Sequence, residues 1–90
     1  MAVATETEVR DRLKALSGWT LKGNAIEKAY TLGDFAKAIA FVNRVAGLAE
    51  KANHHPDILI QYDRVTLTLS SHDSGGLTER DFRLAEQIDA

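Results

Sequence analysis

The segment from Asp34 to about Asn53 constrains the fold more than any other part of the chain. Apolar side chains recur there every three or four residues, which predicts an amphipathic helix with one face toward a core. The members of this stripe are Phe35, Ala38, Ile39, Val42, Val45, Ala46 and Ala49. At about 1.5 Å per residue such a helix is nearly 30 Å long, enough to cross a small sheet. Phe41 and Leu48 flank the stripe, and either widen the core face or form a helix contact between subunits.

The other segments predict short strands and two further helices. Thr5 and Glu8 have the spacing of a capping box, and so do Thr78 and Asp81. The expected elements, in chain order, are a helix at 5–17, strands at 19–21 and 25–32, the helix at 34–53, strands at 58–62 and 65–71 joined at 63–64, and a last helix after Thr78. The order α-β-β-α-β-β-α predicts an α+β fold, in which three helices pack on one face of a four-stranded antiparallel sheet. The edges of that sheet are expected to be covered by a partner subunit.

Composition narrows the possible functions. The 90 residues are enough for one domain spanning 1–90. There is no cysteine, which excludes disulfides, thiolate catalysis and cysteine-ligated metal sites. A net charge of −2 gives no electrostatic reason to bind nucleic acid or an anionic membrane. Neither a signal-peptide-like start nor an apolar run of membrane-spanning length is present in the sequence, so we expect a cytoplasmic protein.

The three histidines lie close together in the sequence, at positions 54, 55 and 72. Histidine changes its charge near neutral pH, which makes it the usual general acid or base. His54 and His55 end the long helix and His72 ends the last strand, and these two ends can meet at one rim of the domain. Glu50 precedes His54 by four residues, so the two side chains are expected to pair on the helix. Asp81 has a sufficient structural explanation as part of the helix cap, but it also lies beside the His72 loop.

The same residues could in principle form a metal site or a catalytic triad. Three histidines with Glu50 or Asp73 could bind zinc, but their spacing matches no standard motif, and adjacent His54 and His55 do not both reach one ion comfortably. We therefore expect no metal. A catalytic triad of Ser70, His72 and Asp81 is weaker, because no nucleophile elbow is present. Surface histidines at loop boundaries remain the structural alternative.

The complete spacing resembles that of a known family. Glu50, three residues, His54-His55-Pro56, five residues, Tyr62, nine residues, His72, eight residues and Asp81 is similar to the pattern of the pterin-4a-carbinolamine dehydratases. The similarity extends over essentially the whole chain. Asn53 stands where many relatives have aspartate, and Ser71 stands where many have threonine.

The resemblance implies a fold with the same element order and a lyase activity. The reaction would be dehydration of 4a-hydroxytetrahydropterin to quinonoid dihydropterin and water, which recycles the tetrahydropterin cofactor of aromatic amino-acid hydroxylases. The pterin would be the substrate, with no further cofactor. The protein would form a homodimer or homotetramer. The alternative is a non-catalytic dimerisation, regulatory or assembly role on the same scaffold.

The resemblance also implies roles for individual residues. His54 and His72 would act as acids on opposite faces of the pterin, and His55 would hold the ring and accept the N5 proton. Glu50 would tune His54, and Asp81 would order His72 or the ring. The remaining residues that would line the site are Asn53, Ser70, Ser71 and Asp73. Trp19 is either a wall of the site or part of the core.

Overall fold

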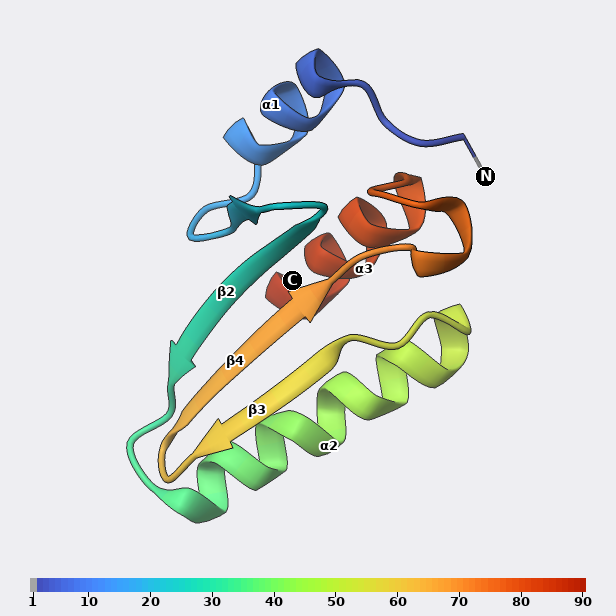
Figure 1. Cartoon of the computed structure of the whole chain (residues 1–90). Helices are drawn as coiled ribbons and strands as arrows, with labels where there is room; N and C mark the ends of the chain where they lie inside the picture. Colours follow the sequence, from blue (N-terminus) through green and yellow to red (C-terminus); the bar gives the residue numbers. More distant parts are fainter. Residues whose placement is uncertain (1) are drawn as a thin grey trace.

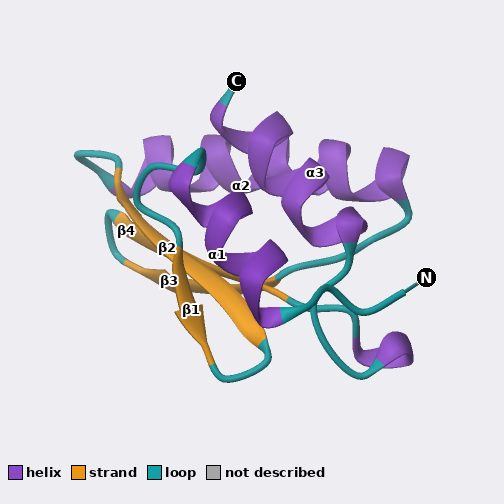
Figure 2. Ribbon diagram, turned by 90° about the horizontal axis from the view of Figure 1, so that it is seen from above, coloured by secondary structure: helices purple, strands orange, loops and turns teal. Residues whose placement is uncertain are grey.

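Three helices cover one face of a four-stranded antiparallel sheet in the computed structural model, which describes residues 2–90 (Figures 1 and 2). The elements are α1 (Glu6–Lys14), β1 (Thr20–Lys22), β2 (Ala25–Thr31), α2 (Phe35–Ala52), β3 (Asp57–Gln61), β4 (Arg64–Leu69), the single 3-10 turn η1 (His72–Ser74) and α3 (Glu79–Asp89). The predicted fold class and element order are confirmed. The short turn η1 was not predicted. Within residues 2–90 no helix is both long and apolar enough to cross a membrane.

Strand β4 lies inside the sheet, whose order is β1-β2-β4-β3. It pairs with β2 through Ile26 and Leu69, and with β3 through Ile58 and Leu67. Alternate side chains of β4 are fully buried under the helices, and these are Val65, Leu67 and Leu69. Their burial fixes the register of β4, because a shift of one residue would turn all three toward solvent. The end of β4, from which the next loop starts, is therefore held in place.

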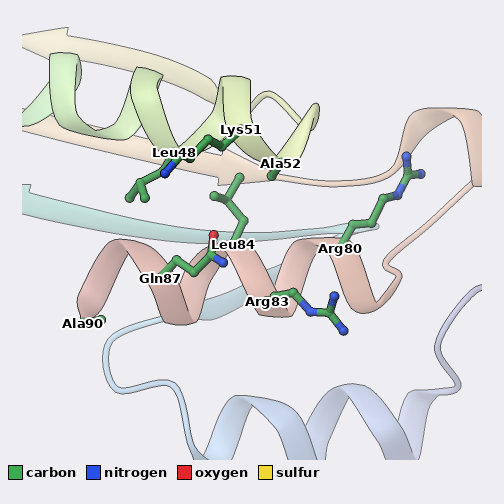
Figure 3. Close-up of a pocket in the computed structure, with 8 residues that line it drawn as sticks. All are labelled: Leu48, Lys51, Ala52, Arg80, Arg83, Leu84, Gln87 and Ala90. Carbon is green, nitrogen blue, oxygen red and sulfur yellow. The ribbon is translucent and has the colours of Figure 1, made fainter.

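The buried face of α2 is rotated about the helix axis relative to the predicted apolar stripe. Phe35 is 52% exposed and Ala46 is also exposed, although both were predicted to face the core. Phe41 and Leu48, on the other flank of the helix, are half-buried instead. The rotation has a physical cause in the neighbours of α2. Phe41 packs against Tyr30 with ring centroids 4.6 Å apart, and Leu48 lies beside α3 (Figure 3).

The outer strand β3 is far more exposed than an alternating pattern predicts. Ile58, Leu59 and Ile60 are 36%, 55% and 37% exposed. No strand in residues 2–90 pairs with its outer edge. The turn after β3 is formed by Tyr62 and Asp63 rather than by residues 63–64, and Tyr62 adopts a left-handed φ of 56°.

The last residue of α3, Asp89, ties that helix to the sheet. Its Oδ2 accepts hydrogen bonds from Trp19 Nε1 at 2.8 Å and Lys28 Nζ at 2.9 Å, and its Oδ1 accepts one from Tyr30 at 2.6 Å. Trp19 precedes β1 and is buried in the core, which decides between its two interpretations. Burial and the hydrogen bond to Asp89 raise the pKa of Tyr30. Burial alone would raise the pKa of Asp89, but the three donors outweigh it and lower that pKa.

Asp89→Asn is expected to lower the free energy of unfolding at pH 7 by about 1–2 kcal/mol, because it weakens charge-assisted hydrogen bonds. Since the pKa of Asp89 is lowered by folding, this contribution is present above the unfolded value of about 4 and is lost as pH falls below it. Urea unfolding followed by the fluorescence of Trp19 should therefore show the difference between the variant and the wild type shrinking as pH falls below about 4. The exposed Asp11→Asn variant is the control. A difference that persists unchanged at low pH would contradict the assignment.

Candidate active site

The ends of α2 and β4 meet at one rim of the domain, as the sequence predicted. They border an open pocket of about 330 Å³. This volume is at the small end of the ~300–1,000 Å³ range of ligand pockets. Its lining is formed by Asn53, His54, His55, Ser70, His72, Asp73 and Arg80. Six of these residues were predicted to belong to the site, and Arg80 was not.

His54 is held by a buried carboxylate at the base of this cavity. Its Nε2 lies 2.5 Å from Asp81 Oδ1, and the two residues are 7% and 0% exposed. Because the carboxylate accepts, Nε2 must carry the proton of this hydrogen bond. The other ring nitrogen, Nδ1, forms no hydrogen bond to any described residue and remains for a ligand. A buried carboxylate behind an imidazole fixes its orientation and balances the charge when the ring is protonated.

The rest of the Asp81 carboxylate is satisfied from inside the fold. Its Oδ2 accepts from Ser71 Oγ at 2.8 Å and from the backbone N–H of Thr78 at 2.9 Å. The bond from Thr78 completes the predicted capping box of α3. Ser71 and Asp81 are therefore buried behind the cavity wall and support His54 rather than line the cavity.

The carboxylate partners of the histidines differ from those expected. Glu50 pairs with His55, whose Nε2 lies 2.5 Å from Oε2, and not with His54. Asp81 pairs with His54, and not with His72. The cause is the end of α2, where Asn53 adopts a left-handed conformation with φ 49° and turns the chain. This turn moves His54 toward α3 and brings His55 beside Glu50 at the exposed mouth of the site.

His72 begins η1, which follows β4 after Ser70 and Ser71, and it is exposed. Its nearest polar neighbour, Ser70 Oγ, lies 3.4 Å from Nδ1, which is long for a hydrogen bond. The backbone of His72 is therefore held by η1, whereas its imidazole ring makes only this long contact. The geometry also does not support a catalytic triad of Ser70, His72 and Asp81, which the sequence already disfavoured, since Asp81 is engaged with His54.

Arg80 is the lining residue that sequence reasoning missed. Its Nη2 donates to Asp73 Oδ1 at 2.6 Å, and this hydrogen bond lowers the pKa of Asp73. One signal was available in the sequence. Arg80 occupies the second position of α3, where the positive end of the helix dipole disfavours a cation.

The cavity thus presents three imidazoles, one ionised carboxylate and one guanidinium to a single ligand. Such a set can deliver a proton to one ligand atom and remove a proton from another. Among residues 2–90, no group of three or more histidine, aspartate or glutamate side chains has an arrangement that could hold a metal ion.

Comparison with known proteins gives the same family as the residue spacing. The family model described as pterin 4 alpha carbinolamine dehydratase matches residues 2–90. Curated relatives from several organisms carry the name "Putative pterin-4-alpha-carbinolamine dehydratase". The protein from Roseiflexus castenholzii is 56% identical over 98% of this chain and 95% of its own. The protein from Sulfurisphaera tokodaii is 46% identical over 99% and 96%.

Two solved structures share the fold. The transcriptional coactivator/pterin dehydratase from Brucella melitensis superimposes with a TM-score of 0.92 at 37% identity, covering 97% of this chain and 95% of that one. A pterin dehydratase-like protein identified as a RuBisCO assembly factor in the alpha-carboxysome gives 0.64 at 26% identity, covering 79% and 82%. On the match of the whole described chain to the family model, and on these identities, the chain belongs to the pterin-4-alpha-carbinolamine dehydratase family.

Proposed function

We propose that this protein dehydrates 4a-hydroxytetrahydropterin to quinonoid dihydropterin and water by histidine acid–base catalysis. The observation that carries the proposal is the convergence of His54, His55 and His72 on one cavity, with His54 backed by buried Asp81. The pterin is the substrate, and the proposal includes no further cofactor. In the cell the product would be reduced again to the tetrahydropterin that aromatic amino-acid hydroxylases use. The proposed setting is a cytoplasmic homodimer or homotetramer.

The reaction requires two proton transfers and the breaking of one bond. A protonated imidazole donates its proton to the C4a hydroxyl, and the C4a–O bond then breaks to release water. The N5 proton is removed, so that the electron pair of the N5–H bond forms the new N5–C4a double bond. His54 and His72 would serve as the acids, one on each face of the ring. Asp81 would stabilise His54 in its protonated state, because it places a buried negative charge 2.5 Å from Nε2.

His55 would hold the ring and accept the N5 proton. Its Nε2 is engaged by Glu50, so Nδ1 is the nitrogen left to face a ligand. A carboxylate that is already in place stabilises the imidazolium formed when the proton arrives. Glu50 therefore supports His55 in this scheme rather than His54.

The decisive test is the decay of freshly generated 4a-hydroxytetrahydropterin, followed by absorbance with and without the protein. After subtraction of the spontaneous rate, we expect an enhancement of at least roughly 10²-fold, the contribution of a single positioned acid or base. Heat-unfolded protein is the control for catalysis by free imidazole. A spontaneous rate in the presence of folded protein would disprove the dehydratase function.

An assembly role is the second candidate. The similarity to the RuBisCO assembly factor and the exposed apolar side chains of β3 favour it. It predicts a stable complex with a larger protein that survives replacement of His54 and His72. If dehydration is not accelerated and such a complex is isolated, this second function replaces the first.

A further inference from the structure

We propose that Arg80 is a positioning residue, which fixes the Asp73 carboxylate at the cavity mouth to receive the 2-amino and N3–H donors of the pterin ring. The inference rests on the proposed pterin substrate and adds the means by which the ring is recognised and oriented.

The first observation is the ion pair between Arg80 and Asp73. Arg80 Nη2 and Asp73 Oδ1 are 2.6 Å apart, and both residues line the histidine cavity. The Asp73 side chain is 71% exposed, whereas that of Arg80 is 27% exposed. The arginine is therefore the anchored member of the pair and the aspartate the one that faces outward. No described side chain donates to Oδ2 of Asp73, which leaves that oxygen for a ligand.

The second observation is that stability alone does not explain the placement of Arg80. Its Nε is buried and has no hydrogen-bond partner within residues 2–90. A buried donor without a partner costs folding free energy, and a cation in the first turn of a helix adds to that cost. Arg80 also lines the groove between α2 and α3, where Leu48 and Leu84 lie (Figure 3). The side chain is thus held in one direction, toward the loop that carries Asp73.

The third observation concerns the chemistry of the ligand. One edge of the pterin ring presents two adjacent donors, the 2-amino group and N3–H, and a carboxylate matches such an edge. Asp73 is the single carboxylate among the residues that line the cavity. Asp81 is buried and fully engaged, and Glu50 is not among the residues that line the cavity. Asp73 is therefore the carboxylate that can receive this edge while the histidines face N5 and C4a.

The test compares binding of two stable ligands, an oxidised pterin and lumazine, by titration calorimetry. Lumazine has an oxo group in place of the 2-amino group and so lacks one donor. We expect wild type to bind the pterin at least roughly tenfold more tightly than lumazine, because a charge-assisted hydrogen bond is lost. Arg80→Gln should lower pterin affinity by a similar factor and abolish the preference. In the dehydration assay it should raise KM with little change in kcat.

The controls separate positioning from general structure. Arg83→Gln removes a charge from the same helix, and Figure 3 shows Arg83 extending away from the side chain of Arg80. It should leave both affinities unchanged. Arg80→Lys should recover part of the preference, because it restores a donor to Asp73. Asp73→Asn should lose the preference, and the double variant should lose no more than either single one.

Three results would overturn the proposal. The first is equal affinity of the wild type for the pterin and lumazine. The second is an unchanged pterin affinity in Arg80→Gln. The third is a loss of affinity in the double variant that equals the sum of the two single losses. The binding measurements do not depend on turnover. Preferential pterin binding without accelerated dehydration would therefore overturn the proposed catalysis and support the recognition by Asp73 and Arg80.

Discussion

His54→Gln and His72→Ala are each expected to lower kcat by roughly 10²–10⁴-fold toward the C4a epimer whose hydroxyl that histidine protonates, the range of a lost general acid. Glutamine is chosen at position 54 because its amide can still donate to Asp81, so the buried carboxylate keeps a partner. Alanine is suitable at position 72 because that side chain is exposed and makes only a long contact with Ser70. Both variants should therefore fold, and unfolding in urea provides the check.

A substrate that contains both C4a epimers allows the roles of the two acids to be tested separately. If the two acids act on opposite faces of the ring, each single variant should leave one C4a epimer to decay at the spontaneous rate while the other is still accelerated. The progress curve would then have two phases, and the double variant would lose both accelerated phases. His55→Gln should instead raise KM and also lower kcat toward both epimers, because His55 is proposed both to hold the ring and to accept the N5 proton. Single variants that retain full activity toward both epimers would show that the acids are wrongly assigned.

Asp81→Ala is expected to have the largest effect on stability, lowering the free energy of unfolding by about 3–5 kcal/mol. The variant leaves His54 Nε2, the Ser71 hydroxyl and the Thr78 N–H without their acceptor in a buried environment. A domain of this size has a total stability of about 5–15 kcal/mol, so the variant will be close to unfolding at room temperature. Urea titration followed by Trp19 fluorescence measures the change.

Asp81→Asn keeps the prediction testable if the alanine variant does not fold. The amide is close in shape but offers one acceptor instead of a charged pair, so we expect a smaller loss of about 1–3 kcal/mol. Activity should fall as well, since the protonated state of His54 loses its buried counter-charge. The exposed Asp11→Asn variant should change stability by less than about 0.5 kcal/mol. If Asp81→Asn matches that control in stability and activity, Asp81 has no role beyond filling space.

The parts of the fold that follow from local rules were predicted correctly from the sequence. The alternation of Val65, Leu67 and Leu69 identified the buried face of β4, and Asp34 and Thr78 identified the starts of their helices. The direction of burial on α2 was not predictable in the same way. It depends on where α3 and β2 lie against that helix, and these contacts come from distant parts of the chain.

The predicted pairing of Glu50 with His54 was wrong because of a single residue, Asn53. The rule that residues four apart meet on a helix predicts Glu50 with His54, but it holds only while the helix continues. Asn53 ends it in a left-handed conformation, and the N–H of His54 then bonds to the carbonyl of Ala49. Asparagine before a His-His-Pro sequence was a usable signal for this ending. The pairing of His54 with Asp81, 27 residues away, depends on tertiary structure that no local rule supplies.

The buried hydrogen-bond network around Asp81 also makes the site depend on the docking of α3 against the rest of the domain. It joins His54, two residues past the end of α2, to Ser71 after β4 and to the first turn of α3. A partial opening that releases only α3 would leave the sheet paired but separate His54 from its carboxylate. Loss of activity on mild heating should therefore precede loss of the strand amides' protection from hydrogen exchange. Under the proposed function, the dehydration rate would then report the docking of one helix rather than the integrity of the whole domain.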